Sequence, residues 1–149
     1  MPAFRGWFGP PDMSLVLDSS VTLARIWVNE STAAVTEVFE RLVGQGAWVP
    51  SLWRLEVANA LEMDIRRGRH PAEFRDGALA DLALLPIQID PDTDHQAWGA
   101  TARLAEKHRL TLYDSAYLEL ALRRGLALAT LDRQLRSAAS AERVPLLGL

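Results

Sequence analysis

The chain has 149 residues, a length typical of one domain with a hydrophobic core of its own. It is 49% hydrophobic and 23% charged, as in ordinary soluble proteins, and no apolar stretch reaches the roughly 18 residues that a membrane span needs. A net charge of −3 argues against general electrostatic attraction to nucleic acid. The absence of cysteine excludes disulfides, zinc–thiolate sites and thiol nucleophiles.

The N-terminal segment differs in composition from the rest of the chain. Residues 1–12 are rich in Gly and Pro and lack the apolar centre of a signal peptide. Met13 directly precedes the first strand-like run. We therefore expect a flexible extension over residues 1–12 and one folded domain over residues 13–149, located in the cytoplasm because no targeting segment is recognisable.

Short apolar runs alternate with segments of helical periodicity along the domain. The apolar runs predict strands and lie, in chain order, at residues 13–18, 47–49, 86–89, 126–130 and 144–147. The helical segments lie at residues 21–28, 31–46, 50–68, 71–85, 92–109, 113–124 and 131–139. This alternation predicts an α/β domain with a short central parallel sheet of four or five strands, covered by helices on both faces.

The long helix expected over residues 50–68 has a recognisable start and an apolar side. Pro50 is expected in its first turn, where proline is tolerated. Four apolar residues at helical spacing predict the face that packs on the core: Leu52, Leu55, Ala58 and Leu61.

The segment before Gly125 contains both an ambiguous run and a clear helix end. Residues 110–112 (LTL) are too short to assign as a strand. Gly125 is expected to end the helix that follows, and Tyr117 within that helix is expected in the core. Arg123 and Arg124 would complement the negative end of the helix dipole.

Four acidic residues lie where an α/β chain brings side chains to one edge of its sheet. Sites in such sheets form outside the carboxyl ends of the strands. Asp18 ends the first strand, Asp114 begins a helix, and Asp132 begins the helix after the strand at 126–130. Glu56 lies one to two turns inside a helix, so it reaches this edge only if that helix lies alongside.

Each of these residues also has a simple structural explanation, because Asp is among the best residues for capping a helix N-terminus. Together, however, a cluster of carboxylates cannot stay ionised at neutral pH without a compensating positive charge. A hard divalent cation with oxygen ligands, such as Mg²⁺, would provide that charge. The joint pattern therefore predicts a metal site.

The same pattern resembles the PIN-domain nucleases. The matching segments, which span nearly the whole chain, are LVLDSS (15–20), PSLWRLEVANAL (50–61), LTLYDSAYLELAL (110–122) and LALATLD (126–132). The overall length and the pair Glu56 and Asn59 resemble in particular the VapC-type toxins of toxin–antitoxin pairs. The resemblance implies a PIN-like three-layer αβα fold. The extension over residues 1–12 departs from the usual pattern, in which the first strand begins at the N-terminus.

The resemblance also implies an activity and its residues. The protein would be a Mg²⁺- or Mn²⁺-dependent endoribonuclease toxin, neutralised by a cognate antitoxin and usually a homodimer. Asp18 and Asp114 would bind the metal directly. Glu56 and Asp132 would complete the site through water or a second ion and would orient the attacking water. The polar residues expected to support the site are Ser20, Asn59 and Thr130.

Two other classes of protein remain as alternatives. One is a phosphoaspartyl-type hydrolase, which would also use an Asp at the end of the first strand. Such a site normally needs a Lys near the phosphoryl group, and Lys107, the one lysine, precedes the LTL run at the wrong end of it. The other is a PIN-fold module that binds RNA or protein without cutting. An unused carboxylate cluster would only be repulsive, and this argues against such a module.

Overall fold

The computed structural model describes residues 14–149, so the extension expected over residues 1–12 lies outside the described part. Five strands form one sheet in the order β3-β2-β1-β4-β5, and every pairing is parallel. Their bounds are β1 Leu15–Leu17, β2 Ala47–Val49, β3 Ile87–Ile89, β4 Ala127–Ala129 and β5 Leu146–Leu147. A strand therefore lies within each of the five predicted runs.

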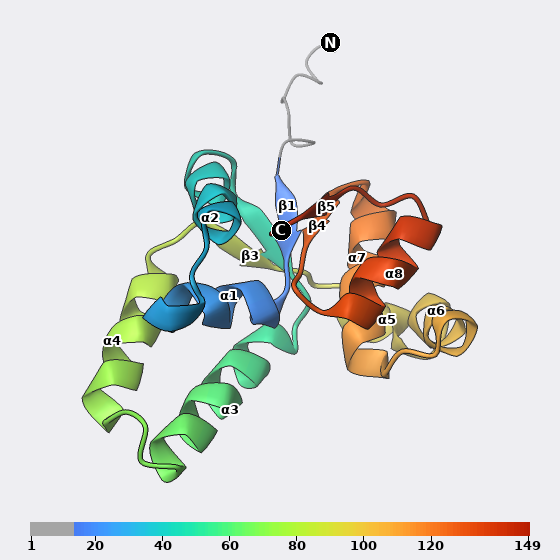
Figure 1. Cartoon of the computed structure of the whole chain (residues 1–149). Helices are drawn as coiled ribbons and strands as arrows, with labels where there is room; N and C mark the ends of the chain where they lie inside the picture. Colours follow the sequence, from blue (N-terminus) through green and yellow to red (C-terminus); the bar gives the residue numbers. More distant parts are fainter. Residues whose placement is uncertain (1–13) are drawn as a thin grey trace.

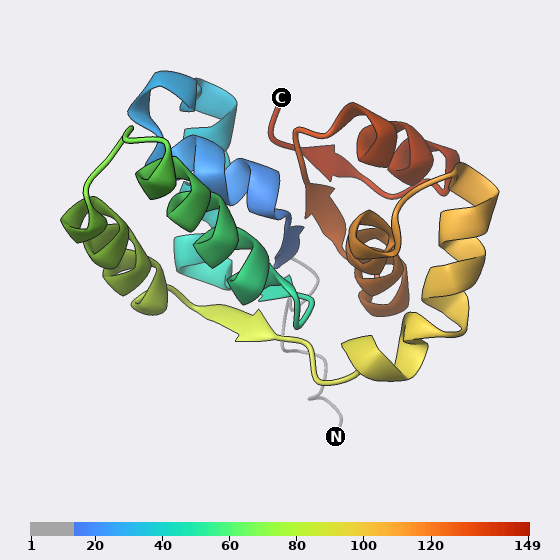
Figure 2. The same ribbon diagram turned by 90° about the horizontal axis from the view of Figure 1, so that it is seen from below.

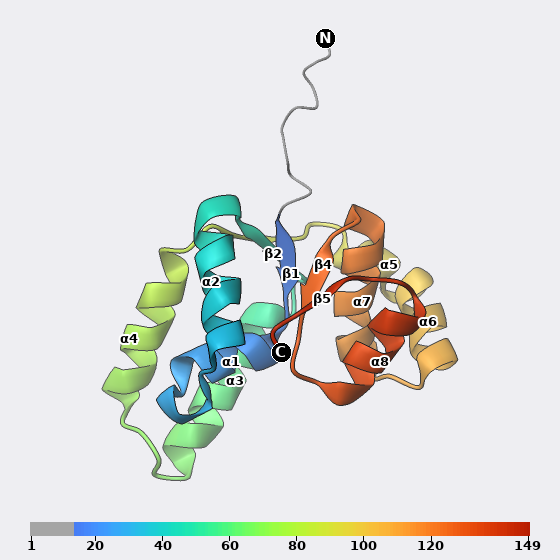
Figure 3. The same ribbon diagram turned by 45° about the horizontal axis from the view of Figure 1, so that its top comes forward.

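Helices cover both faces of the sheet. They are α1 Ser19–Ile26, α2 Ala33–Gln45, α3 Trp53–Arg66, α4 Ala72–Ala83, α5 Thr93–Ala97, α6 Ala100–His108, α7 Leu112–Arg124 and α8 Arg133–Ala141, with a short 3₁₀ helix, η3, at Val28–Glu30. Figure 1 and Figure 3 show the strands between two groups of helices, α1–α4 on one side and α5–α8 on the other. This arrangement confirms the expected α/β fold. None of these helices, all within residues 14–149, is long and apolar enough to cross a membrane.

The strand order reverses between β1 and β4. The chain runs outward from β1 to β2 and β3, then returns to form β4 on the other side of β1. Both strands are buried along their whole length and pair in register, Leu15 with Ala127 and Leu17 with Ala129. In open parallel sheets, ligands bind at the carboxyl ends of the strands where the order reverses. A ligand site is therefore expected among the residues that follow β1 and β4.

The structure corrects the prediction for α3. The helix begins at Trp53, whose backbone N–H donates to the Pro50 carbonyl at 3.0 Å, so Pro50 precedes the helix. Leu55, expected in the buried stripe, is 76% exposed. The buried face contains Leu61, as predicted, together with Trp53, Val57 and Asp64. This rotation follows from the indole N–H of Trp53, which donates to the Thr22 hydroxyl at 3.1 Å and fixes that face against α1.

Two other segments differ in detail from the expectation. Residues 110–112 form no strand, because Thr111 caps α7: its hydroxyl accepts from the Asp114 backbone N–H at 3.1 Å. The single helix expected over residues 92–109 is two helices, α5 and α6, separated at Trp98 and Gly99. The end of α7 is as predicted, because Gly125 adopts the left-handed conformation (φ 66°) that glycine tolerates best.

Candidate active site

Asp18 lies at the carboxyl edge of the sheet, called the acidic edge below because Glu56, Asp114 and Asp132 also approach it. It follows β1, its backbone N–H donates to the Ala129 carbonyl at 3.0 Å, and its side chain is held beside the end of β4. The residue is only 4% exposed. Its Oδ2 accepts hydrogen bonds from the hydroxyls of Ser20 (2.6 Å) and Thr130 (2.7 Å). The two hydroxyls therefore hold the Asp18 carboxylate in a fixed orientation, whereas its side chain does not cap α1.

Glu56 reaches the same edge from α3. Figure 2 looks onto this edge, with α3 on one side and α7 and α8 on the other. The Tyr117 hydroxyl on α7 donates to Glu56 Oε1 at 2.5 Å, and Ser19 at the start of α1 also hydrogen-bonds the carboxylate. These contacts place α3 alongside the edge. Glu56, which lies within that helix, could reach the other acidic residues only with α3 in this position.

Asp114 and Asp132 lie at the N-terminal ends of two neighbouring helices. Asp114 is the third residue of α7, and its backbone N–H is held by the Thr111 cap. Asp132 is the N-cap of α8, and its Oδ1 accepts from the Leu135 backbone N–H at 2.8 Å. Among Asp18, Asp114 and Asp132, therefore, Asp132 alone caps a helix with its side chain. The cap uses one of the two oxygens of its carboxylate.

Electrostatics show that the four carboxylates form one group. Burial raises the pKa of Asp18, and the negative charges of Glu56 and Asp132 raise it further. Burial likewise raises the pKa of Glu56, with a contribution from Asp114. The pKa of Asp114 rises to about 6, first through burial and then through repulsion by Asp132 and Asp18. Each of the four carboxylates thus lies close enough to at least one other for their negative charges to repel each other.

The four carboxylates of Asp18, Glu56, Asp114 and Asp132, called the quartet below, have no cation among the described residues. None of the ion pairs within residues 14–149 involves any of the four carboxylates. Within the same residues, no three His, Asp or Glu side chains form a ready-made metal site. The donor set nevertheless fits Mg²⁺, which typically takes one or two carboxylates directly and keeps several waters. Uncompensated carboxylates with raised pKa values are what such an ion would neutralise.

The remaining predicted residues fall into two groups. Ser20 and Thr130 contact Asp18 directly, and the Thr130 hydroxyl also accepts from the Asp132 backbone N–H at 3.0 Å. Asn59 is exposed on α3. Among residues 14–149, the side-chain hydrogen bonds to Asp18 and Glu56 come from hydroxyl groups rather than from the Asn59 amide.

Sequence reasoning missed three groups around the site. Ser19 and Tyr117 hydrogen-bond Glu56, although Tyr117 was expected to be a core residue only. Burial and the neighbouring carboxylates raise the pKa of Tyr117 above its ordinary value, so its hydroxyl remains a donor. Tyr117 lies three residues after Asp114, and that spacing on one helix face was a usable signal. Thr22 accepts from the Trp53 indole and donates to the Asp18 carbonyl at 3.2 Å, a link that no sequence spacing indicates.

The chain is similar to known proteins in sequence and in fold. The PIN domain family matches residues 15–141, which include all four carboxylates. The chain belongs to the PIN domain family. This PIN domain is 34% identical over 137 residues to Ribonuclease VapC3 of Pyrobaculum aerophilum, covering 91% of the chain and 98% of that relative. It is also similar in fold to the crystal structure of PAE2754 from Pyrobaculum aerophilum, with a TM-score of 0.63 over 85% of each chain at 23% identity.

Proposed function

We propose that this PIN domain protein is a Mg²⁺- or Mn²⁺-dependent endoribonuclease. The observation that carries the proposal is the convergence of four carboxylates with no cation of their own at the switch point of the sheet. The likeness to a protein named as a ribonuclease supports RNA as the substrate.

In this proposal the four carboxylates divide the work. Asp18 and Asp114 hold the ion, because they lie on adjacent elements and repel one another until a cation is present. Glu56 and Asp132 orient the attacking water, directly or through a second ion. A bound divalent ion supplies a water of lowered pKa and stabilises charge on the phosphate oxygens. The hydroxyls that keep the Asp18 carboxylate in place are Ser20 and Thr130.

The substitution Asp18→Asn tests the assignment. We expect RNA cleavage to fall at least about 100-fold, the upper end of what residues supporting metal ligands contribute. The stabilisation of the unaltered protein by Mg²⁺, measured as a shift in Tm, should be lost as well. Asp81→Asn, an exposed carboxylate on α4, is the matched control and should change neither. Intact cleavage and intact Mg²⁺ stabilisation in Asp18→Asn would show the assignment to be wrong.

A non-catalytic PIN module that only binds RNA or protein is the second candidate, and metal distinguishes it. A nuclease loses activity with a chelator and regains it with Mg²⁺ or Mn²⁺, whereas a binding module responds to neither treatment. The phosphoaspartyl alternative is less well supported, because Lys107 forms an ion pair with Glu142 at 2.8 Å instead of approaching the quartet.

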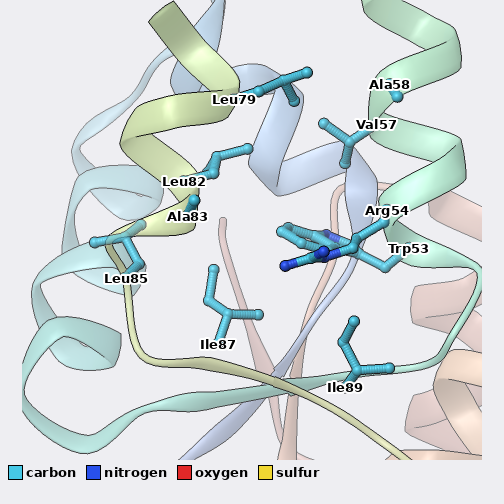
Figure 4. A pocket seen from close by; sticks show the side chains of 10 residues that line it. All are labelled: Trp53, Arg54, Val57, Ala58, Leu79, Leu82, Ala83, Leu85, Ile87 and Ile89. Atoms are coloured by element: carbon cyan, nitrogen blue, oxygen red, sulfur yellow. The ribbon is translucent and has the colours of Figure 1, made fainter. Parts of the chain in front are cut away.

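We also propose that the protein is the toxin of a toxin–antitoxin pair in the cytoplasm, neutralised by a cognate antitoxin. An apolar groove of about 300 Å³ lies between α3, α4 and β3. Figure 4 shows side chains from these elements facing into it. Its lining includes Trp53, Val57, Leu79, Leu82, Leu85, Ile87 and Ile89. An amphipathic helix of the antitoxin would fit such a groove, and a basic side chain beside it would compensate the quartet.

Two substitutions, one on α4 and one at the residue that follows it, test the groove. Leu79→Asp places a charge in the groove, whereas Leu84→Asp changes a residue of the same segment that is 84% exposed. We expect the first variant to cleave RNA but to resist inhibition by the antitoxin, while the second remains inhibited. Equal inhibition of both variants, with unchanged Tm, would exclude the groove as the antitoxin site.

The expected homodimer needs an apolar surface outside the core. Trp98, between α5 and α6, is 97% exposed, which is unusual for tryptophan. We propose that a second copy of the chain covers it. Sedimentation should then show a dimer for the unaltered protein and a monomer for Trp98→Asp, and a monomer in both cases would reject the proposed contact.

A further inference from the structure

Tyr117 connects two walls of the acidic site. Its side chain is fully buried on α7, and its hydroxyl donates to Glu56 Oε1 on α3 at 2.5 Å. A buried phenol needs a hydrogen-bond partner, but a backbone carbonyl would serve that purpose. A carboxylate acceptor makes the bond charge-assisted, and bonds of that kind are shorter and stronger than neutral ones.

Glu56 depends on contacts with other helices for a fixed position. It lies in the first turn of α3, half-buried, on a side chain with several rotatable bonds. Tyr117 holds it from α7 and Ser19 holds it from α1. A carboxylate can accept about four hydrogen bonds, so these two donors leave some of its lone pairs unused. The free lone pairs are available to a water molecule.

The same helix also carries Asp114. Asp114 and Tyr117 are three residues apart on α7, so their side chains lie on neighbouring parts of one helix face. Asp114 and Glu56 are mutually repelling carboxylates. The rigid turn between residues 114 and 117 therefore fixes where Glu56 lies relative to Asp114, against that repulsion.

We propose that Tyr117 is a positioning residue of the cleavage reaction, which orients the Glu56 carboxylate relative to Asp114 so that its free lone pairs face the attacking water. This inference rests on the proposed ribonuclease function. The competing explanation is that the hydroxyl only satisfies a buried phenol and stabilises the fold. The two explanations differ in whether the effect of removing the hydroxyl depends on Glu56.

The test combines Tyr117→Phe with Glu56→Gln in the full-length protein. Steady-state RNA cleavage at saturating Mg²⁺ gives kcat and KM for each variant. We expect Tyr117→Phe to lower kcat about 10- to 100-fold, as for other residues that orient a metal site, with KM unchanged within about twofold. In the Glu56→Gln background the same change should have no further effect, because residues that act through one another are not additive.

Tyr113 provides the matched control. It lies one turn before Tyr117 on α7 and is 65% exposed, so Tyr113→Phe should cleave RNA normally. Ser19→Ala, which leaves the buried phenol in place, should lower kcat in the same direction and by a smaller factor.

NMR of the metal-free protein detects the hydrogen bond between Tyr117 and Glu56 without any measurement of activity. A slowly exchanging, downfield hydroxyl proton should be visible by NMR, lost in Tyr117→Phe and kept in Tyr113→Phe. An unchanged kcat after loss of that signal, or an equal loss of kcat in both Glu56 backgrounds, would overturn the positioning role. Failure of the unaltered protein to cleave RNA with any divalent metal would instead overturn the proposed function, and the role of Tyr117 with it.

Discussion

Asp18 and Asp90 are two buried aspartates in the same kind of position with opposite surroundings. Each directly follows a strand, β1 or β3, and the two residues are 4% and 1% exposed. Asp90 Oδ2 receives Arg123 Nη2 at 2.7 Å, and its Oδ1 receives Arg124 Nη2 at 3.1 Å. Within residues 14–149, the side chain of Asp18 receives hydrogen bonds from hydroxyl groups alone. Arginines therefore neutralise the Asp90 carboxylate, whereas no cation in this part of the chain neutralises that of Asp18.

The pKa values follow this difference. Burial alone would raise the pKa of Asp90, but hydrogen bonds from Arg123, Arg124 and Thr93 lower it to about 2. Its ion pairs therefore stabilise the fold above the ordinary pKa of 3.8, and this stabilisation is lost as pH falls toward 2. In Asp18, Glu56 and Asp114, burial and repulsion by neighbouring carboxylates raise the pKa instead. A buried carboxylate paired with arginines stabilises the fold, while the unpaired carboxylate of Asp18 is consistent with the proposed binding of an external cation.

The largest effect on stability is expected from Asp90→Ala. This change removes the buried carboxylate that Arg123 and Arg124 share and leaves Arg123 with Glu119 at 2.8 Å, and the free energy of unfolding should fall by about 3 kcal/mol at pH 7. Urea unfolding measures it. The control is Asp92→Ala: Asp92 is half-exposed and 3.9 Å from Arg123, so less than about 1 kcal/mol should be lost. Equal losses in both variants would remove the structural half of the comparison.

Asp114→Asn should have the opposite sign. A pKa raised to about 6 means that ionised Asp114 destabilises the fold. The folded protein therefore loses stability as pH rises from 3.8 to 6. The variant should therefore be more stable than the unaltered protein at pH 7 in chelator, by about 1–2 kcal/mol after allowing for solvent screening of a half-exposed group. At pH 4 the difference should vanish.

Asp94→Asn controls for the helix dipole in this experiment. Asp94 is an exposed residue in the first turn of α5, as Asp114 is in the first turn of α7. Both changes remove a favourable charge at a helix N-terminus, so only the loss of repulsion within the quartet separates them. A gain at pH 7 in both variants would show that repulsion within the quartet is not its cause.

The smallest effect on stability is expected from removing helix caps. Thr111→Ala and Thr32→Ala each delete a side-chain cap, of α7 and α2 respectively, and each should cost about 1 kcal/mol. Only Thr111 holds the turn that carries Asp114. RNA cleavage at a temperature where both variants are folded should therefore fall in Thr111→Ala alone, and a similar fall in Thr32→Ala would mean that general loosening is responsible.

Local patterns were sufficient to predict much of the fold. Buried strands such as β4 are continuous apolar runs, and Gly125 is of the residue type that best tolerates a left-handed helix end. Asp18 could be placed at the sheet edge because a strand in a parallel sheet has a defined carboxyl end. These inferences succeed because the signal and the structure lie within a few residues of each other.

Predictions that depended on long-range packing failed or stayed open. Leu55 has the spacing of a core residue, but the contact of Trp53 with Thr22, 31 residues away, rotates α3. Arg123 and Arg124 were assigned to the helix dipole, whereas their main partner, Asp90, lies 33 and 34 residues earlier. The position of Glu56 likewise depends on Tyr117, 61 residues later. No local periodicity reports such partners.

The hydrogen-bonded link through Trp53 has a thermodynamic consequence. The indole forms part of the groove lining, its N–H donates to Thr22, and the Thr22 hydroxyl donates to the carbonyl of Asp18. A partner that shifts Trp53 would therefore perturb the residue at the centre of the acidic edge. Coupling between two ligands is reciprocal. If occupation of the groove weakened cation binding by some factor, the cation would weaken the partner's binding by the same factor, and magnesium would then influence how firmly the proposed antitoxin binds.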